Sequence, residues 1–341
     1  MKQSTKEYLV DRMYKASAGL ANAVLVTLGI GLLIESIGIF TGLTALVTVG
    51  KTAQLMLAPA FGAGIAYQLG GNTLVIFSAM AASTIGANAL QFTEAGAILV
   101  TGQPLSAVLA ALIAIWVGKR VAGKTQLDML AIPLSGIVVG GLAGYFLAFV
   151  TTPLIELVSA FIASSVQGSP LLGPIVISLV WSMFLMSPAS SAAIAISLQL
   201  DPVSSAAALI GCTVQFVGFT VMSYRQNELG SNLAQGVLTP KVQFPNVVKN
   251  PRVLIPPFIS AMICAPIATL LFKLEAPYEV AGLGLNSFIA PLNILANQGV
   301  NPFFVYVGIG ILLPAVITIV IYRVLKGIGW IKAGDLHLKV Q

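Results

Sequence analysis

Residues 171–222 read LLGPIVISLVWSMFLMSPASSAAIAISLQLDPVSSAAALIGCTVQFVGFTVM, and their only charged side chain is Asp201. A membrane-spanning helix needs about 20 apolar residues, so this run is too long for one span. Proline-containing breaks at Ser187-Pro188 and Asp201-Pro202 divide it. The pattern predicts a span on either side, with Asp201 as N-cap of the second. The piece between them, 189–200, is too short to cross a bilayer of normal thickness.

The whole chain continues this pattern. Of its 341 residues, 57% are apolar and 8% are charged, with a mean hydropathy of +0.96. Soluble domains carry about 25% charged residues, so the chain is a polytopic membrane protein. Its length allows about ten spans and leaves no room for a fused kinase, ATPase or phosphocarrier domain. The expected fold is all-α, with spans at about 17–40, 43–68, 73–90, 104–118, 127–150, 171–187, 189–200, 203–222, 253–272 and 302–322.

Basic clusters predict the topology, since positively charged loops stay in the cytoplasm. They fall near the N-terminus, at 119–124, at 225–252 and after residue 322. Ten crossings place all four clusters and both termini on the cytoplasmic side. The segment 189–200 could instead be re-entrant. The amphipathic stretch 153–167 could then replace it as a crossing. We expect one membrane domain with an amphipathic surface segment, two helical halves and a cytoplasmic tail, at 1–15, 16–150, 151–325 and 326–341.

Several kinds of chemistry lack the residues they need. Cys212 and Cys264 lie within apolar runs and suit buried, reduced thiols, and the single histidine, His337, lies in the tail. The sequence contains no metal-ligand cluster, phosphate-binding loop or serine–histidine arrangement. The basic residues sit in short connections, where they set topology. We therefore expect no catalytic residue, no metal, no cofactor and no nucleic-acid partner.

Glu35 and Lys51 are expected to face each other across a tight turn near residue 41. Antiparallel helices would place them at depths that differ by about 5 Å, at 1.5 Å per residue. This predicts an intramembrane ion pair, whose members could couple transport to an ion. The competing interpretation is an interfacial pair with Lys51 reaching toward water.

A polar break between the third and fourth spans is the first candidate solute site. It contains Asn88, Gln91 and Glu94, followed by Gln103 before the next helix. Amides with a carboxylate supply the donors and acceptors that a polyhydroxylated ligand needs. Irregular backbone at membrane depth is tolerated where it lines protein or a cavity. An ordinary external loop is the alternative.

Two later breaks resemble the discontinuous helices of transporters. One is Ser187-Pro188 with the serines that follow it, whose hydroxyls could simply bond back to their own helix. The other is 282–297, where Asn286 and Asn293 interrupt apolar residues. Amides in an apolar stretch need partners, so we expect a re-entrant hairpin or mobile loop that contributes both asparagines to the solute site.

The longest polar connection, 223–252, is the candidate docking surface for a soluble partner. Its first turn carries Arg225, Asn227 and Glu228. A loop held against the helix ends for structural reasons is the alternative, because a polar connection does not by itself identify a partner.

An ordered set of short motifs resembles a known family. It includes Pro188-Ala-Ser-Ser-Ala-Ala-Ile-Ala, Gly211-Cys, Ser223-Tyr-Arg-Gln-Asn, Ala234-Gln-Gly and Pro245-Asn. Together these motifs resemble the permease subunit IIC of the bacterial phosphotransferase system, in its compact branch of perfringolysin-regulator (PfoR) type. The resemblance covers nearly the whole chain.

The resemblance implies a homodimeric permease in the bacterial cytoplasmic membrane. One half would form the dimer contact and the other the chamber for a sugar or sugar-like solute, which a separate IIB protein would phosphorylate. The chain departs from the larger IIC type, whose Gly-Ile-Thr-Glu-like motif holds the sugar through a glutamate; here the corresponding stretch is Gly284-Leu-Asn286-Ser287. A membrane-embedded regulator without transport and an ion-coupled transporter are the rival functions.

Overall fold

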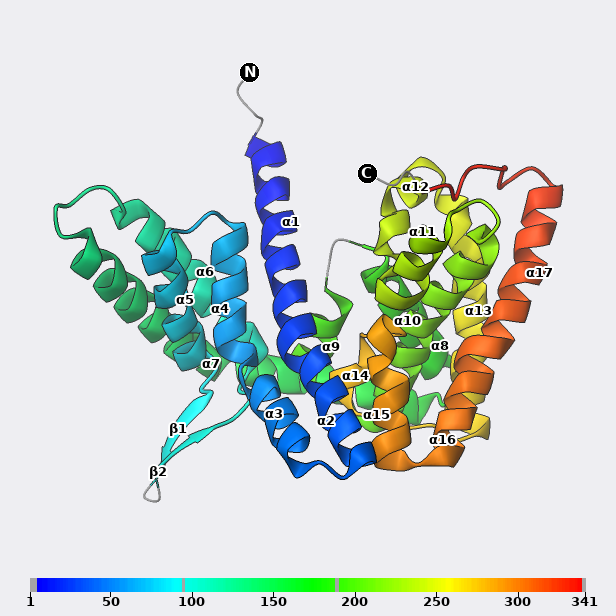
Figure 1. The fold of residues 1–341 in the computed structure, drawn as a ribbon, viewed down its shortest axis with the longest axis horizontal. Helices are drawn as coiled ribbons and strands as arrows, with labels where there is room; N and C mark the ends of the chain where they lie inside the picture. Colours follow the sequence, from blue (N-terminus) through cyan, green and yellow to red (C-terminus); the bar gives the residue numbers. More distant parts are fainter. Residues whose placement is uncertain (1–4, 94–95, 188–189, 339–341) are drawn as a thin grey trace. The chain divides into compact units, whose positions relative to one another are not determined.

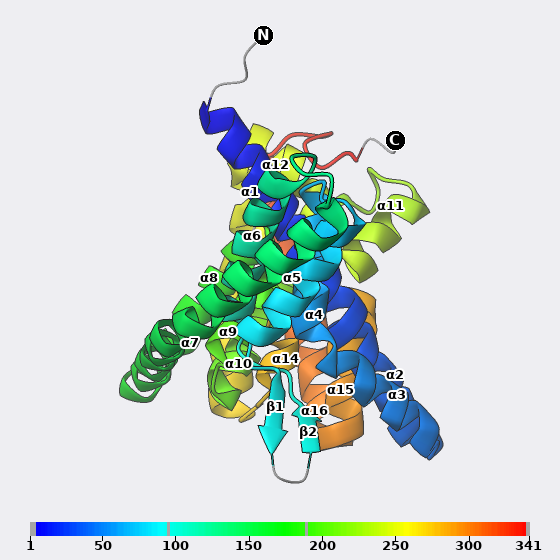
Figure 2. The same cartoon turned by 90° about the vertical axis from the view of Figure 1, so that its left-hand side faces the viewer.

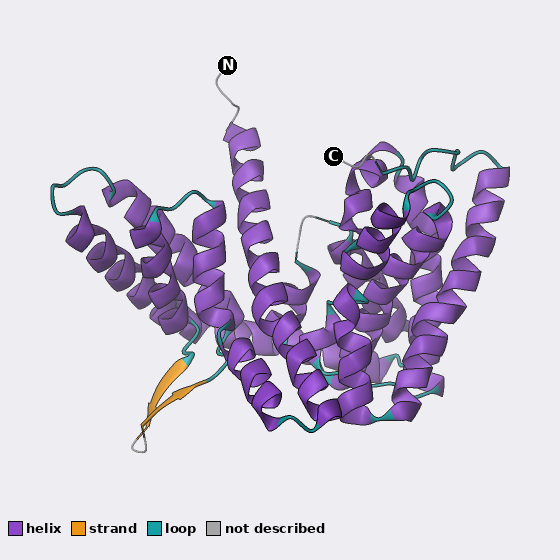
Figure 3. Cartoon of the chain, in the orientation of Figure 1, coloured by secondary structure: helices purple, strands orange, loops and turns teal. Residues whose placement is uncertain are grey.

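The computed structural model describes residues 5–93, 96–187 and 190–338 of the chain (Figure 1). It is 80% helical, which confirms the predicted all-α class (Figure 3). The chain divides into two units, Met1–Val158 and Ser159–Gln341, each with its own hydrophobic core. The division falls within the long helix α7 (Asp128–Gly168), as does the predicted boundary between residues 150 and 151.

Six helices among the described residues are long and apolar enough to cross a bilayer. They are Asp11–Thr41, Pro104–Val121, Asp128–Ser164, Pro202–Ser223, Pro251–Leu271 and Val300–Gly327. Two shorter apolar helices, Thr73–Gly86 and Leu172–Leu185, also occupy predicted spans. The structure thus supports a multi-pass membrane protein, while the number ten stays a prediction.

Three predicted segments have a different helical structure. The stretch 43–68 forms two helices that meet at Met56, because Pro59 has no N–H with which to continue the hydrogen-bond ladder. Conversely, 127–150 and 153–167 form one helix, α7, which runs through Pro153 (Figure 2). Its length of 41 residues exceeds what one straight span requires.

The first unit contains α1 (Thr5–Ala23), η1 (Val24–Gly29), α2 (Ile30–Thr41), α3 (Thr44–Leu55), α4 (Leu57–Gln68), α5 (Thr73–Gly86), α6 (Pro104–Val121) and most of α7. Helix α5 packs against both α4 and α6. The approach to α4 is close: a Cβ at Gly62 would lie 2.5 Å from the carbonyl carbon of Ala79. Small residues at such contacts let helix backbones meet in a membrane.

A β-hairpin occupies the polar break between α5 and α6. Strand β1 (Leu90–Thr93) pairs antiparallel with β2 (Gly96–Leu99), with Leu90 opposite Leu99 (Figure 3). Hydrogen bonds from Val100 N to Ala89 O and from Gln103 N to Ala87 O extend this closure to the start of α6. Backbone pairing therefore orders the described parts of this break, 90–93 and 96–103.

The second unit is built around α10 (Pro202–Ser223), whose side chains are almost all buried. Asp201 caps it as predicted, because its Oδ1 accepts hydrogen bonds from the Val203 and Ser204 N–H groups at 3.1 Å. Helix α10 contacts α8 (Leu172–Leu185), α13 (Ile255–Pro266) and α17 (Leu313–Gly327). The remaining elements are α9 (Ser191–Leu198), α11 (Leu229–Leu233), η2 (Ala234–Leu238), η3 (Pro240–Gln243), α12 (Phe244–Lys249), η4 (Pro251–Leu254), η5 (Ile267–Leu271), α14 (Tyr278–Ala281), η6 (Asn286–Phe288), α15 (Ile289–Gln298), α16 (Val300–Val305) and η7 (Tyr306–Leu312).

Candidate functional site

Two broken segments of the second unit meet beside α10. Helix α9 begins just after the predicted break at Ser187-Pro188, and Pro188 lies outside the described residues. The Ser191 hydroxyl, at the first position of α9, donates a 2.9 Å hydrogen bond to the carbonyl of Gly282. Helix α14, which ends just before Gly282, contacts both α9 and α10. The segments that follow the two predicted breaks, near residues 188 and 282, are thus in direct contact with each other.

Two glycines allow this segment to approach α9 and α10 closely. A Cβ at Gly282 would lie 2.5 Å from the backbone nitrogen and Cα of Ala192. Gly284 has a φ of +59°, which glycine tolerates best, and a Cβ there would lie 2.7 Å from the Phe216 ring. The segment after α14 therefore lies directly on the middle of α10.

A third segment reaches α10 from the long polar connection. The turn η2 contacts both α10 and η6, and a Cβ at Gly236 would lie 2.9 Å from the Thr220 hydroxyl. The next turn, η3, brings the half-buried Lys241 within electrostatic range of Cys212. Cys212 in turn lies near Ser191. Two of these segments thus contact α10 directly, between Cys212 and Thr220, and the third, α9, is joined to them through α14.

The same region contains a carboxylate that sequence reasoning missed. Glu279 is half-buried in α14, one helical turn before Gly282. Burial, together with the charge of Glu279 and a hydrogen bond to it, raises the pKa of Tyr278 to about 12, so its phenol remains a donor at neutral pH. The signal was an isolated acid between Pro277 and Gly282. With Asn286, these groups supply both acceptors and donors.

The predicted site residues divide between the two units. Asn88 closes α5 in a left-handed conformation (φ +51°) and is exposed, and Gln91 is exposed on β1. Gln103 caps α6: its Oε1 accepts from the Ser106 backbone N–H at 2.5 Å, and its Nε2 donates to Thr151 at 3.2 Å. Glu94 lies outside the described residues. Among the described members of this group, Gln103 has a clear structural role.

The two later asparagines belong to the second unit. Asn286 is half-buried at the start of η6, and its Oδ1 accepts a 2.9 Å hydrogen bond from the Ser287 hydroxyl. Asn293 is buried in α15, where its carbonyl accepts a hydrogen bond from Asn297. Asn286 lies two residues after Gly284 in the segment on α10, so it is the better placed of the two for the site described above.

Glu35 and Lys51 lie across the contact between α2 and α3. Lys51 Nζ is 3.8 Å from Glu35 Oε1, and Gln54 Nε2 donates a 2.6 Å hydrogen bond to Glu35 Oε2. The Lys51 side chain is 64% exposed and that of Glu35 16% exposed. An exposed partner makes the pair worth little in stability. A role in ion coupling stays a prediction.

The predicted docking loop holds the C-terminal segment. Asn227 donates to the Leu336 carbonyl at 3.0 Å and accepts from the Leu338 N–H at 2.7 Å. Gln226 Oε1 accepts from the Gly334 N–H at 2.9 Å. Arg225 instead bonds the adjacent Tyr224 hydroxyl, while Glu228 is exposed before α11. Asn227 therefore has a structural role, since it holds the C-terminal segment against the loop.

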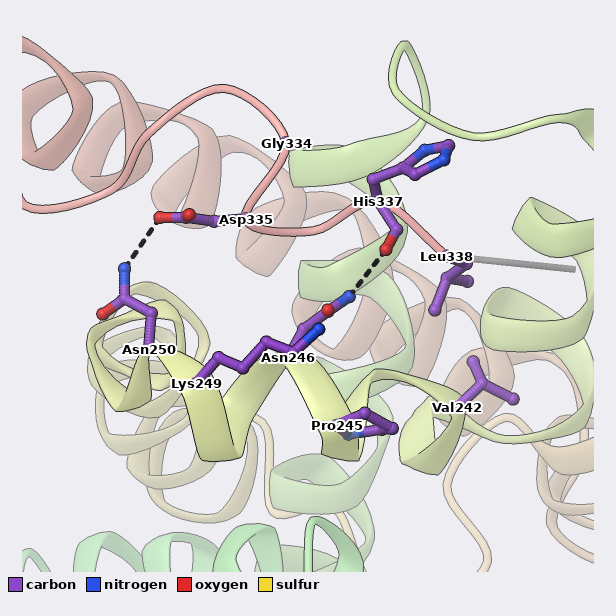
Figure 4. Close-up of a pocket in the computed structure, with 9 residues that line it drawn as sticks. All are labelled: Val242, Pro245, Asn246, Lys249, Asn250, Gly334, Asp335, His337 and Leu338. Carbon is purple, nitrogen blue, oxygen red and sulfur yellow. Dashed lines mark hydrogen bonds between the residues drawn. The ribbon is translucent and has the colours of Figure 1, made fainter.

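A chain of amides continues this attachment. Gln243 Nε2 donates to both Gln235 Oε1 and the Leu336 carbonyl, and Asn246 Nδ2 donates to the His337 carbonyl at 3.0 Å. Beside these bonds is a pocket of about 540 Å³ between α12 and the C-terminal segment (Figure 4). Asn250 closes its far end with a 2.7 Å hydrogen bond to Asp335.

The Asn227→Ala variant tests this attachment. We expect faster hydrogen exchange at the Leu338 amide, because the side chain that accepts its hydrogen bond is removed. The cost of one such bond, about 0.5–1.5 kcal/mol, corresponds to roughly a 2- to 12-fold loss of protection. Exchange measured by mass spectrometry checks this, with Asn301→Ala, an exposed position in α16, as control. Unchanged protection at Leu338 would contradict the role of Asn227.

A scan against protein-family models matches residues 14–338 to the EIIC component of the phosphotransferase system. The match covers nearly the whole chain. The chain belongs to this family. It is therefore a membrane-embedded permease component of a bacterial phosphotransferase system. No curated protein matched the EIIC chain.

Proposed function

We propose that this EIIC protein carries a small polar solute, a sugar or sugar-like compound, across the bacterial membrane. The meeting of α9 with the 278–288 segment, and the contacts of the 278–288 and 234–243 segments with α10, carry the proposal. Transporters bind solutes where helices are interrupted, because freed backbone groups and nearby polar side chains can then contact the solute.

The solute would be recognised within the second unit. Glu279 supplies a carboxylate acceptor, Tyr278 a phenolic donor and Asn286 an amide, and polyhydroxylated solutes use both donors and acceptors. The half-buried Lys241 adds a donor within electrostatic range of Cys212. Glu279 would serve as the acid that seemed absent from the Gly284-Leu-Asn286-Ser287 stretch. Asn88, Gln91, Glu94, Gln103 and Asn293 remain secondary candidates for contacts with the solute.

The proposal also includes a partner protein, an oligomeric state and a membrane orientation. A soluble IIB protein would phosphorylate the solute at the inner face, the permease would work as a homodimer, and both termini would lie in the cytoplasm. Of the three predicted docking residues, Glu228 is the strongest, because Asn227 holds the tail and Arg225 is stacked on Tyr224. About ten crossings, and membership of the perfringolysin-regulator branch, complete this proposal.

The Asn286→Ala variant tests the assignment of the site. Removing an amide that bonds a neutral hydroxyl costs about 0.5–1.5 kcal/mol, so we expect binding to weaken by roughly 2- to 12-fold. The measurement is equilibrium binding of radiolabelled hexoses, hexitols and disaccharides to the purified protein. Asn297→Ala, at the exposed end of α15, is the matched control. Equal binding by both variants would reject Asn286 as a solute contact.

Uptake distinguishes the rival functions. A permease of this kind moves solute in proteoliposomes, and accumulation that requires added phosphocarrier proteins indicates group translocation. A regulator would bind a solute without moving it. Uptake by an ion-coupled transporter would depend on a proton or sodium gradient. The Lys51→Ala variant would then lose this dependence.

A further inference from the structure

A second pocket in the second unit lies where α10 and α17 end. It has a volume of about 310 Å³, and three of the residues that line it are cations: Arg225, Arg323 and Lys326. The described residues that line it include no carboxylate. Neither described salt bridge involves these three cations. The pocket therefore gathers three cations with no carboxylate in its described lining, and the nearby acid Asp335 acts electrostatically on Tyr322 in its wall.

Aromatic side chains shape this pocket. Tyr322 is buried in its wall and accepts a 3.1 Å hydrogen bond from Gln226 Nε2. Lys326 Nζ lies 6.0 Å from the Tyr322 ring centroid, and the Arg225 guanidinium lies 5.5 Å from that of Tyr224. Arg323 has no hydrogen bond or ion pair to a described residue, so its five N–H donors are available. The geometry suits an anion that accepts several hydrogen bonds.

An apolar stripe runs along α17 next to the pocket. Val316, Val320 and Val324 are 61%, 56% and 59% exposed and follow one another every four residues. Arg323 is three residues after Val320, so it lies on the adjoining face of the same helix. Tryptophan and tyrosine gather at membrane–water interfaces, and Trp330, with Arg252 at 5.1 Å, follows α17 at this end. A basic pocket at interfacial depth thus adjoins a surface suited to acyl chains.

We propose that this pocket binds the phosphodiester headgroup of an anionic phospholipid. The acyl chains of the lipid lie along Val316, Val320 and Val324. Arg323 and Lys326 contact its phosphate, with Arg225 on the opposite wall of the pocket. Basic pockets between membrane helices bind anionic headgroups. A free phosphate ion shares the headgroup chemistry but has no acyl chains to contact the apolar stripe. The stripe therefore favours a lipid over a free ion.

Native mass spectrometry of the full-length protein tests the proposal, with phosphatidylglycerol and phosphatidylcholine of the same acyl chains as probes. A surface cation contributes enough to anionic-lipid binding for its loss to weaken binding by about fivefold. We expect that loss for phosphatidylglycerol in Arg323→Gln, a larger one in Arg323→Gln/Lys326→Gln, and retention in Arg323→Lys. Lys332→Gln, an exposed cation beyond α17, is the charge-matched control and should bind as wild type.

Three results would overturn the proposal. The first is equal phosphatidylglycerol binding by wild type and the double variant. The second is an equal loss in Lys332→Gln, which would indicate a diffuse charge effect. The third is displacement of the lipid by inorganic phosphate at millimolar concentration, which would indicate a site for a free anion. All substituted side chains are exposed, so the variants should retain the fold.

Discussion

Replacing Gly282 with alanine should reduce solute uptake to about one-hundredth or less of the wild-type rate. The added Cβ would lie 2.5 Å from the backbone of Ala192, and no side-chain rotation can relieve a contact between backbones. Either α9 or the 278–288 segment must move, and overpacking of this kind costs about 1–3 kcal/mol. A displacement near 1 Å would also separate the polar groups that bind the solute, and such misplacement alone can cost about 100-fold.

The design of this experiment separates function from folding. Gly282 has an ordinary negative φ of −97°, so alanine introduces no backbone strain of its own. Gly308→Ala is the matched control, because a Cβ there meets no atom within 4 Å. Thermal melting of both purified variants shows whether Gly282→Ala still folds. Wild-type uptake by Gly282→Ala would mean that the contact between α9 and the 278–288 segment has no part in transport.

Replacing Glu279 with glutamine should weaken solute binding by about 10- to 100-fold. A hydrogen bond to a charged group contributes about 1.5–3 kcal/mol, more than one between neutral groups, and glutamine keeps the shape while removing the charge. Glu279 is half-buried beside Tyr278, whose hydrogen bond would help to orient the carboxylate. Binding of the best sugar of the panel, measured across a concentration series, gives the change directly.

Glu275→Gln is the matched control for this change. Glu275 lies four residues earlier, just before the 278–288 segment, and is exposed. The Glu275→Gln variant should bind solute as the wild type does. Equal weakening in both variants would indicate that a general loss of negative charge, and no specific contact, affects binding. Full binding by Glu279→Gln would remove this carboxylate from the site.

Much of the architecture follows from the sequence. Hydropathy is a sum over about 20 residues, so it predicts spans such as 203–222 well, and Asp201 before Pro202 marked the cap of α10. The extra break at Met56 was less visible, because Pro59 sits inside an otherwise continuous apolar run. The hairpin at 90–99 was read as an irregular break, since its strands are only four residues long.

The site was predicted in pieces, without the contacts that join them. The breaks near Ser187 and Gly282 were each recognised from proline, glycine and polar residues. Their hydrogen bond, from Ser191 to Gly282, joins residues 91 positions apart. Such a contact depends on the packing of α9 against α14 and of α14 against α10, which periodicity does not encode. Glu279 escaped notice for a related reason, because its importance comes from that packing.

Exchange of radiolabelled sugar in proteoliposomes that contain the purified protein tests the central claim most directly. The claim is that a polar solute crosses through the second unit at the middle of α10. Exchange requires no phosphorylation, so it isolates the permease step. We predict that at least one sugar exchanges through the wild type and Gly308→Ala, and that Gly282→Ala abolishes this exchange. Contradiction would come from the absence of exchange for every sugar tested, or from equal exchange by all three proteins.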